Sequence, residues 1–207
     1  MQSDIIVLAA GPSVKEYNLR GLEERGLLIA VNGASIYQKC HIAFTMDRLI
    51  AEHCYPIWKV QGPPEMWIRR GVMKNTKPGA DVTQFEHDGN REGTTMSMRP
   101  GYLNGSNSGT CAFNLALQRA VISKGRVFLL GYDMIRFDKN CAPYWYPGFV
   151  WNPAGGTKDG NLKVWAEEYV DIARQVRALG VQVYNVNHET RLTAFPVITY
   201  DKFRSMT

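Results

Sequence analysis

The chain has 207 residues, 45% of them hydrophobic and 21% charged, with a formal net charge of +5, and this length suits one domain, residues 1–207, with a full hydrophobic core. It contains no apolar stretch of about 18 residues, no run of like charges and no basic leader, so we expect a cytoplasmic protein without a membrane span or a nucleic-acid-binding tail. Its four cysteines form no CxxC pair and no zinc spacing, which predicts reduced, mostly buried thiols.

Short apolar runs alternate with helical segments along most of the chain. Apolar runs without polar alternation are typical of strands buried on both faces, as in a parallel sheet. The predicted strands cover residues 4–10, 27–32, 42–47, 126–133 and 181–187, and the predicted helices cover 14–25, 108–125 and 161–180. This order predicts an α/β, Rossmann-like fold with a mainly parallel, doubly wound sheet.

Two long segments interrupt the alternation. We expect residues 60–107 to form an insertion, with strands in "EMWIRR" (65–70) and "DVTQFEH" (81–87). Residues 134–160 are rich in aromatic residues, proline and glycine. We expect a lid loop there, because long irregular segments of compact domains are often binding loops.

The first predicted strand is followed by Gly11, Pro12 and Ser13. Ligands of open parallel sheets bind outside the carboxyl ends of the strands. Glycine lets the backbone approach a ligand closely, proline can open a helix, and a serine hydroxyl adds to free helix N–H groups that attract anions. Two interpretations stay open, a capped turn without a ligand or the floor of a phosphate site. The glycine spacing matches neither of the two familiar phosphate loops.

Polar side chains also end the other predicted strands, namely Asn32, Asp47 and Asp133, and His188 follows the last one. Each of the two carboxylates either caps the next segment or binds Mg²⁺ beside a nucleotide, since Mg²⁺ accepts one or two carboxylates plus phosphate oxygens. The histidine is either structural or catalytic.

The segment "NGSNSGT" (104–110) precedes an apolar helix. Its asparagines and serines either cap that helix or form a nest of N–H groups and hydroxyls around a phosphate. In the lid loop, Tyr144 and Tyr146 either anchor the loop or contact a sugar, a base or a phosphate.

The ordered set "GPSV", "VN", "FTMD", "NSGTCAFNLAL", "VFLLGYDM" and "VYNVNHETRLTAF" resembles one superfamily, which covers the bacterial CMP-sialic-acid-dependent sialyltransferases and the 6-hydroxymethylpterin diphosphokinase-like proteins. The resemblance implies a Rossmann-like nucleotide-binding domain with a small lid, in a superfamily rich in bacterial and viral proteins of surface-glycan synthesis. It implies that the nucleotide is held by Gly11, Pro12, Ser13, Asn32, Ser108, Gly109, Thr110, Gly131, Tyr144 and Tyr146.

The sequence departs from these sialyltransferases in the lid. They carry a histidine base before the last long helix, whereas "WNPAGGTKDGNLK" (151–163) contains no histidine. A general base must reach the proton of the acceptor, and the substitutes on offer are Asp133, His188, Asp47 and Asp159. The diphosphokinase-like branch implies ATP and Mg²⁺ instead, with Asp47 and Asp133 as metal ligands.

The leading hypothesis is a nucleotide-dependent transferase, a glycosyltransferase that moves a sugar from a nucleotide-activated donor to an unknown acceptor. The alternatives are a Mg²⁺-dependent pyrophosphoryl transferase and a protein that sequesters a nucleotide without turnover. A nucleic-acid-directed protein, indicated by the basic and aromatic stretch "MWIRRGVMKNTK" (66–77), is the least favoured. The expected ligand is a nucleotide-sugar or ATP, with or without Mg²⁺, and the oligomeric state is left open, with a homo-oligomer among the options.

Overall fold

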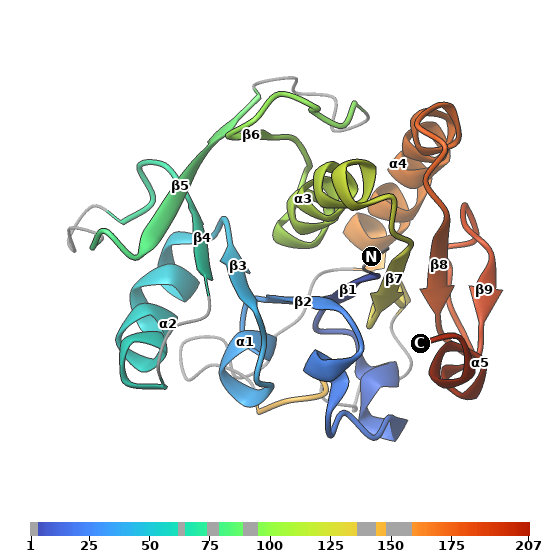
Figure 1. The fold of residues 1–207 in the computed structure, drawn as a ribbon, viewed down its shortest axis with the longest axis horizontal. Coiled ribbons are helices and arrows are strands. Elements are labelled where there is room, and N and C mark those ends of the chain that lie inside the picture. Colours follow the sequence, from blue (N-terminus) through green and yellow to red (C-terminus); the bar gives the residue numbers. More distant parts are fainter. Residues whose placement is uncertain (1–3, 62–64, 74–78, 89–94, 136–143, 148–158) are drawn as a thin grey trace.

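The computed structural model describes residues 4–61, 65–73, 79–88, 95–135, 144–147 and 159–207. A nine-stranded sheet runs through it in the order β6-β5-β4-β3-β2-β1-β7-β8-β9, and every neighbouring pair is parallel (Figure 1). The strands are β1 (Ile5–Leu8), β2 (Leu27–Val31), β3 (Ile42–Thr45), β4 (Glu65–Arg69), β5 (Val82–His87), β6 (Tyr102–Leu103), β7 (Val127–Leu130), β8 (Val183–Val186) and β9 (Val197–Ile198).

The central strands form where the sequence is continuously apolar. All residues of β1, β3 and β7 are buried, because helices cover both faces of the sheet. The five strands predicted from apolar runs are confirmed. The segment expected as an insertion contributes β4, β5 and β6, which extend the same sheet at one edge. Figure 1 shows this edge curving around helix α3.

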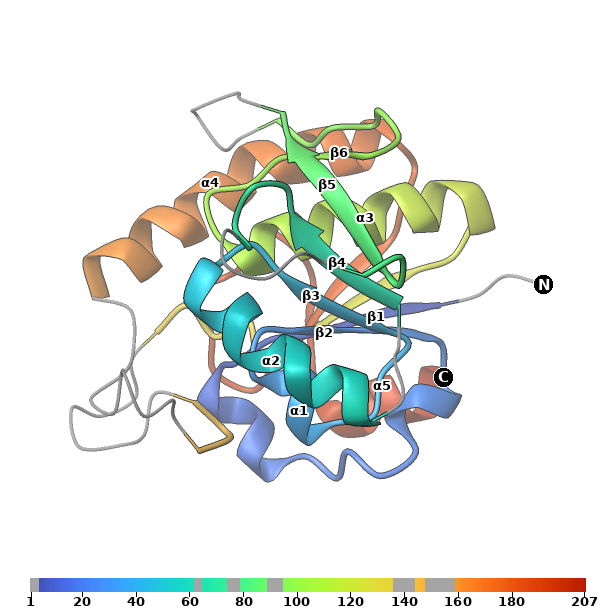
Figure 2. The same cartoon turned by 90° about the vertical axis from the view of Figure 1, so that its left-hand side faces the viewer.

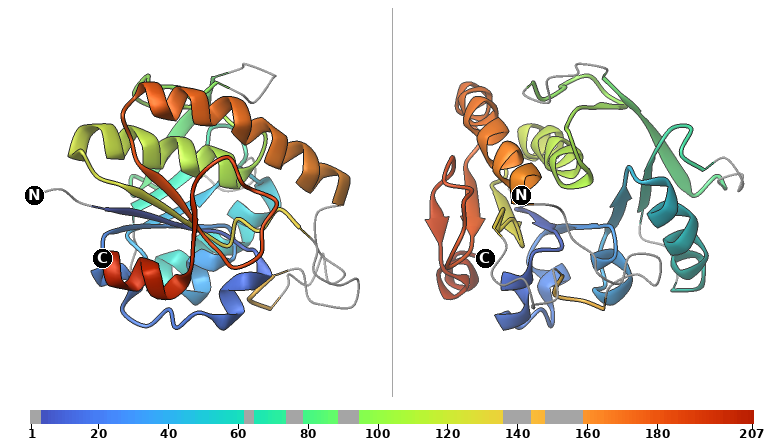
Figure 3. Two further views of the ribbon diagram at one scale, coloured as in Figure 1. Left: turned by 90° about the vertical axis from the view of Figure 1, so that its right-hand side faces the viewer. Right: turned by 180° about the vertical axis from the view of Figure 1, so that it is seen from behind.

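Two layers of helices cover the sheet (Figure 2). The apolar faces of α3 (Ser108–Ser123) and α4 (Asp159–Ala178) pack on one side, in a core that includes Phe113 and Tyr169. The opposite side carries the short turns η1 (Pro12–Glu16) and η2 (Leu22–Glu24) and the helices α1 (Ala34–Tyr37), α2 (Arg48–Gln61) and α5 (Tyr200–Met206). Figure 3 shows both layers from the opposite side and from behind. Among the described residues, no helix is both long and apolar enough to span a membrane.

The prediction of a helix over residues 14–25 is wrong, because the chain forms only the two short turns η1 and η2 there. Tyr17 has an extended backbone, and the Asn18 side chain accepts a hydrogen bond from the Arg20 amide, which favours a turn over a helix. Gly21 then adopts a left-handed conformation with φ of 70°. The predicted helices at 108–125 and 161–180 are confirmed as α3 and α4.

The strand order reverses between β1 and β7. From β1 the chain builds one half of the sheet outward through β2 to β6, then returns along α3 to place β7 on the other side of β1. Because all strands are parallel, their carboxyl ends share one edge. The connections after β1 and β7 therefore leave in opposite directions, and a crevice for a ligand is expected at this switch point.

Candidate ligand site at the carboxyl edge of the sheet

The loops that follow β1 and β7 touch at the switch point. The Gly11 amide donates a hydrogen bond to the carbonyl of Gly131, at 3.0 Å. A Cβ on Gly11 would lie 2.4 Å from that carbonyl oxygen and 2.6 Å from a carboxylate oxygen of Asp133. Gly131 itself has φ of +74° and packs against the first loop. Gly11 is therefore required by the contact between two loops, before any ligand is considered.

Asp133 connects three strands. Its carboxylate accepts hydrogen bonds from the Ser13 amide at 2.9 Å, from the Ser13 hydroxyl, and from the Asn187 side-chain amide at 2.6 Å. The side chain is buried, with 2% of its surface exposed. It thus holds the loop after β1 and the end of β8 onto the end of β7. Asn187 directly follows β8, and its bond to Asp133 makes it part of this clamp.

Burial raises the pKa of Asp133 because the charged form loses hydration, while the hydrogen bonds from Ser13 and Asn187 act in the opposite direction. Both oxygens already accept hydrogen bonds from the protein. In this conformation the carboxylate therefore positions the loops. Among the described residues, no cluster of three or more His, Cys, Asp or Glu side chains could hold a metal ion.

We expect Ser13→Ala to raise the pKa of Asp133 further, because the Ser13 hydroxyl bond lowers that pKa. A group whose pKa is higher in the folded than in the unfolded state stabilises the fold at low pH. This stabilisation is lost as the pH rises from the ordinary pKa of the group, 3.8 for Asp133, through its raised pKa in the folded state. The free energy of unfolding of the variant should therefore fall with pH over a window that extends higher than in the wild type. Carboxyl ¹³C NMR and urea unfolding at stepped pH measure both effects, and an unchanged or lower pKa would contradict the assignment.

A second polar network lies at the ends of β2 and β3. The Asn32 side chain accepts a hydrogen bond from the Thr45 hydroxyl at 2.8 Å, and that hydroxyl accepts one from the Asp47 amide at 3.1 Å. The Ser108 hydroxyl donates to the Asp47 carboxylate at 2.7 Å and accepts from the Met46 amide at 3.2 Å. Asp47 is exposed and has one carboxylate oxygen without a protein donor among the described residues, so it can supply a single metal ligand.

The amino end of α3 adjoins this network. Asn107 caps the helix by accepting a hydrogen bond from the Thr110 amide at 3.0 Å. Tyr132 stabilises the same turn, because its hydroxyl donates to the Gly109 carbonyl at 2.8 Å. The side chains of Ser108 and Thr110, which were predicted to hold the nucleotide, are buried. The backbone of this first turn is therefore the part that suits a ligand. The first N–H groups of a helix lack partners within it.

The described part of the lid loop, residues 144–147, lies along the end of β1. The Trp145 indole donates to the Ala9 carbonyl at 2.8 Å. The Tyr146 ring is 4% exposed and stacks between Tyr144 and Tyr37, with ring centroids 5.3 and 5.5 Å away. Burial raises the pKa of Tyr146. In this conformation Tyr146 anchors the loop, and the rest of the predicted lid lies outside the described residues.

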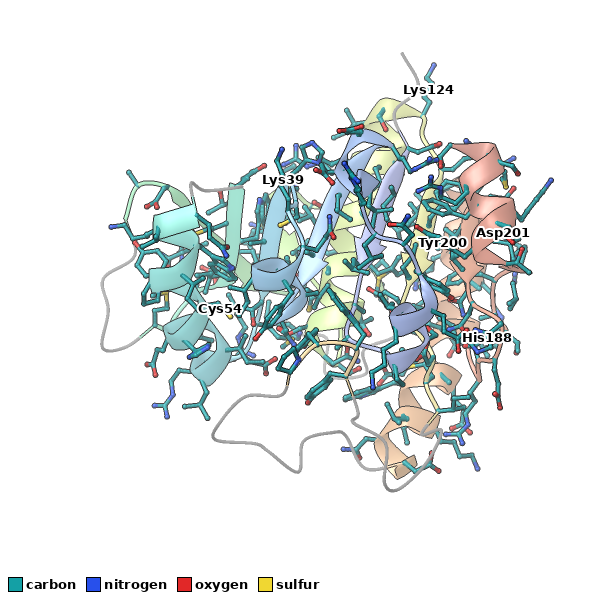
Figure 4. All side chains as sticks on the ribbon, turned by 90° about the horizontal axis from the view of Figure 1, so that it is seen from below. Lys39, Cys54, Lys124, His188, Tyr200 and Asp201 are labelled. Carbon is teal, nitrogen blue, oxygen red and sulfur yellow. The ribbon has the colours of Figure 1, made fainter. Side chains whose placement is uncertain are left out.

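Two histidines lie at the same edge of the sheet. Figure 4 shows that His188, which follows β8, lies at the carboxyl edge of the sheet. Lys39 and Lys124, which precede β3 and β7, lie at the opposite edge. His188 Nδ1 is 3.7 Å from a carboxylate oxygen of Glu16, which places it beside the loop after β1. His87, which sequence analysis did not select, ends β5, and its Nε2 lies 3.0 Å from the Gly105 carbonyl. His188 lies in one of the motifs quoted from the sequence, whereas His87 lies in none of them.

Of the described cysteines, Cys54 and Cys111 are buried and Cys40 is partly buried. Cys40, Cys54 and Cys111 form no disulfide, and burial raises the pKa of each to about 12. Cys141 lies outside the described residues.

No protein-family model matches this chain, and no curated protein matches it. Among solved structures, its fold is similar to that of the MAf glycosyltransferase from Magnetospirillum magneticum AMB-1, at 11% sequence identity and a TM-score of 0.49. The alignment covers 96% of this chain but only 34% of the MAf chain.

Proposed function

We propose that the chain binds a nucleotide-activated sugar at the carboxyl edge of its sheet and acts as a glycosyltransferase. The observation that carries the proposal is the switch point between β1 and β7, where the Gly11–Ser13 loop is clamped onto Asp133. Doubly wound sheets bind nucleotides at this kind of crevice. The ordered motifs that resemble nucleotide-dependent transferases lie along the same edge.

The nucleotide phosphate would lie near the loop after β1 and the first turn of α3. The clamp of Asp133 fixes the loop, and Asn107 fixes the turn of the helix. The Gly11 and Ser13 amides already donate to Gly131 and Asp133. The N–H groups offered to the departing phosphate would therefore be those of the first turn of α3, where a helix N-terminus favours negative charge. Asn32 would contact the nucleotide or its sugar from the end of β2, and the Ser108 hydroxyl would hold Asp47 and the Met46 amide in place beside it.

The proposed reaction is a direct displacement at the activated sugar carbon. The acceptor oxygen forms a bond to that carbon, the bond from the carbon to the phosphate oxygen breaks, and the nucleotide leaves with the bonding electrons. A base takes the acceptor proton. Of the four bases predicted from the sequence, Asp47 and His188 are exposed enough to serve, and Asp159 is exposed but paired with Arg191. Asp133 acts by positioning the loops. If Mg²⁺ takes part, it neutralises phosphate charge, and Asp47 would hold it.

The nucleic-acid alternative receives little support from the described residues. Met66, Trp67 and Ile68 of the basic, aromatic stretch are buried in β4, so they offer no ring for base stacking. One of its two described arginines, Arg70, pairs with Glu86 at 2.6 Å.

Thermal unfolding with CMP, UDP, GDP, ATP and their sugar derivatives, with and without Mg²⁺, tests the proposal. A ligand at about 100 times its dissociation constant stabilises the fold by about 2.7 kcal/mol. We expect such a shift for one nucleotide and its sugar derivative, and a weaker shift when Asn32→Ala and Ser108→Ala are combined. Ser205→Ala, which removes an exposed hydroxyl of α5, is the matched control.

Each other outcome of this experiment has a distinct meaning. No shift with any nucleotide would refute nucleotide binding. A shift that requires Mg²⁺ and ATP would favour the pyrophosphoryl transferase, and tight binding without any turnover would favour sequestration. An undiminished shift in the double variant would refute the placement of the nucleotide at Asn32 and Ser108.

A further inference from the structure

Asn32, which directly follows β2, has one polar group without a partner in the described part of the chain. Its backbone amide donates to the Phe44 carbonyl at 2.8 Å, and its backbone carbonyl accepts from the amide and the hydroxyl of Ser35, at 3.1 and 2.5 Å. Its side-chain oxygen accepts from the Thr45 hydroxyl at 2.8 Å. The side-chain NH₂ group is the polar group that remains, and it is available to a ligand.

The backbone of Asn32 is fixed in an uncommon conformation. Its φ is +55°, in the left-handed region that asparagine tolerates better than most residues other than glycine. The Ser35 hydroxyl that binds the Asn32 carbonyl accepts in turn a hydrogen bond from the indole of the fully buried Trp58, at 2.9 Å. Residues in such conformations persist where the surrounding structure fixes them, and they are frequent at ligand sites. The Asn32 side chain therefore starts from a rigid position.

Thr45 determines which end of the Asn32 side chain faces away from the sheet network. The Asp47 amide can only donate, so its contact at 3.1 Å makes the Thr45 hydroxyl oxygen an acceptor. The single hydrogen of that hydroxyl then goes to the Asn32 side chain, where only the oxygen can accept it. With the Asn32 amide turned over, the fully buried Thr45 hydroxyl would have no acceptor among the described residues. The NH₂ group of Asn32 is therefore the end that faces away from Thr45.

Asn32 lies close to the expected position of the phosphate. β2 is the direct neighbour of β1, at a strand spacing of about 4.8 Å. The hydrogen-bond network that holds the Asn32 side chain continues through Asp47 to the hydroxyl of Ser108, the first residue of α3. Asn32 is thus one strand away from the loop after β1 and is connected to the first turn of α3. These are the two elements beside which the phosphate is proposed to lie.

We propose that Thr45 is a positioning residue that fixes Asn32 as a hydrogen-bond donor to a phosphate oxygen of the nucleotide, an inference that rests on the proposed function. A phosphate oxygen without a proton only accepts hydrogen bonds, so it pairs with the NH₂ group and is repelled by the side-chain oxygen of Asn32. Hydrogen bonds to an ionised acceptor are roughly twice as strong as neutral ones. Thr45 then controls the affinity for the nucleotide without touching it.

The test measures, by calorimetric titration below the unfolding range, the Kd of the nucleotide that gives the wild type its largest thermal shift. Asn32→Ala removes the donor and should raise Kd about 10- to 100-fold, which is the effect of losing a hydrogen bond to a charged group. Thr45→Val keeps the shape of the side chain but lacks the hydroxyl. The Asn32 amide then also adopts the turned-over orientation, and Kd should rise at least about 3-fold because a smaller fraction of the protein is ready to bind.

Two further variants separate positioning from packing. Thr45→Ser keeps the hydroxyl but loses a buried methyl group, so it should lower Tm and yet restore most of the affinity that Thr45→Val loses. Thr83→Val makes the same substitution in β5, three strands away from β2, and is the matched control. If Thr45 acts through Asn32, adding Thr45→Val to Asn32→Ala should change Kd by less than about 2-fold.

Three results would overturn the assignment. The first is a wild-type Kd in Thr45→Val or in Asn32→Ala. The second is an equal rise in Kd when Thr45→Val is made in the wild type and in Asn32→Ala, since Thr45 would then act by another route. The third is a Kd that follows Tm, with Thr45→Ser as weak as Thr45→Val, which is the result of a structural role. A wild type that binds no nucleotide is distinct from these results, because it refutes the proposed function and this inference together.

Discussion

We expect Gly11→Ala to lower the free energy of unfolding by about 3 to 5 kcal/mol, from overpacking together with lost hydrogen bonds to a buried charge. The new Cβ would lie 2.4 Å from the Gly131 carbonyl oxygen and 2.6 Å from the Asp133 carboxylate. Neither neighbour can yield, because Gly131 is held between two loops and Asp133 accepts hydrogen bonds from Ser13 and Asn187. Urea unfolding of the purified variant measures the loss.

Gly160→Ala is the control for this substitution. Gly160 lies in the first turn of α4, and a Cβ there meets nothing within 4 Å. Its free energy of unfolding should stay within about 1 kcal/mol of the wild type, since alanine favours a helix. If Gly11→Ala were equally mild, the two loops would not be in contact in solution. The same pair of variants separates stability from ligand binding, because only the first alters the switch point.

The second large effect is expected for Asp133→Asn, with a loss of about 2 to 4 kcal/mol. The amide has nearly the same shape, but it replaces one acceptor oxygen by an NH₂ group among donors from Ser13 and Asn187. At least one buried donor then loses its partner. The loop after β1 should also detach from β7, which hydrogen exchange at the Ser13 amide would detect as faster exchange.

Asp47→Asn provides the contrast, because Asp47 is exposed and, within the part of the chain that the structure describes, its carboxylate accepts a hydrogen bond only from Ser108. Its asparagine can still accept that bond, so the stability should change by less than about 1 kcal/mol. Equal effects of the two substitutions would contradict the central position of Asp133. If Asp133 acted as the chemical base, its asparagine variant would lose turnover at unchanged stability, which is the opposite of our expectation.

The strands were predictable because their burial is recorded in continuous apolar runs, as in β1 and β7. The prediction of a helix over 14–25 was wrong because the pattern of charged residues there carries no information about the left-handed backbone at Gly21. No helix was predicted from the sequence where α2 lies. This helix contains Pro56, at an exposed position. Prolines usually end helices.

The site was partly predictable for a similar reason. Carboxyl ends of parallel strands share one edge, so Ser13, Asn32 and Asp133 could be assigned to it from the sequence. Their partners could not, because those depend on the strand order: Ser13 meets Asp133 only because β1 lies beside β7. The contact of His87 with Gly105 depends likewise on how the edge of the sheet curves around α3.

The position of β1 also affects how the chain is made. This strand pairs with β7, and 120 residues separate Ser13 from its partner Asp133. At about 5 to 20 residues per second, a ribosome needs roughly 6 to 24 s to reach the partner. During that interval β1 is an open, apolar edge of a half-built sheet, and such edges pair with other chains. Synthesis of the protein thus includes a period in which a chaperone would protect the nascent chain from aggregation.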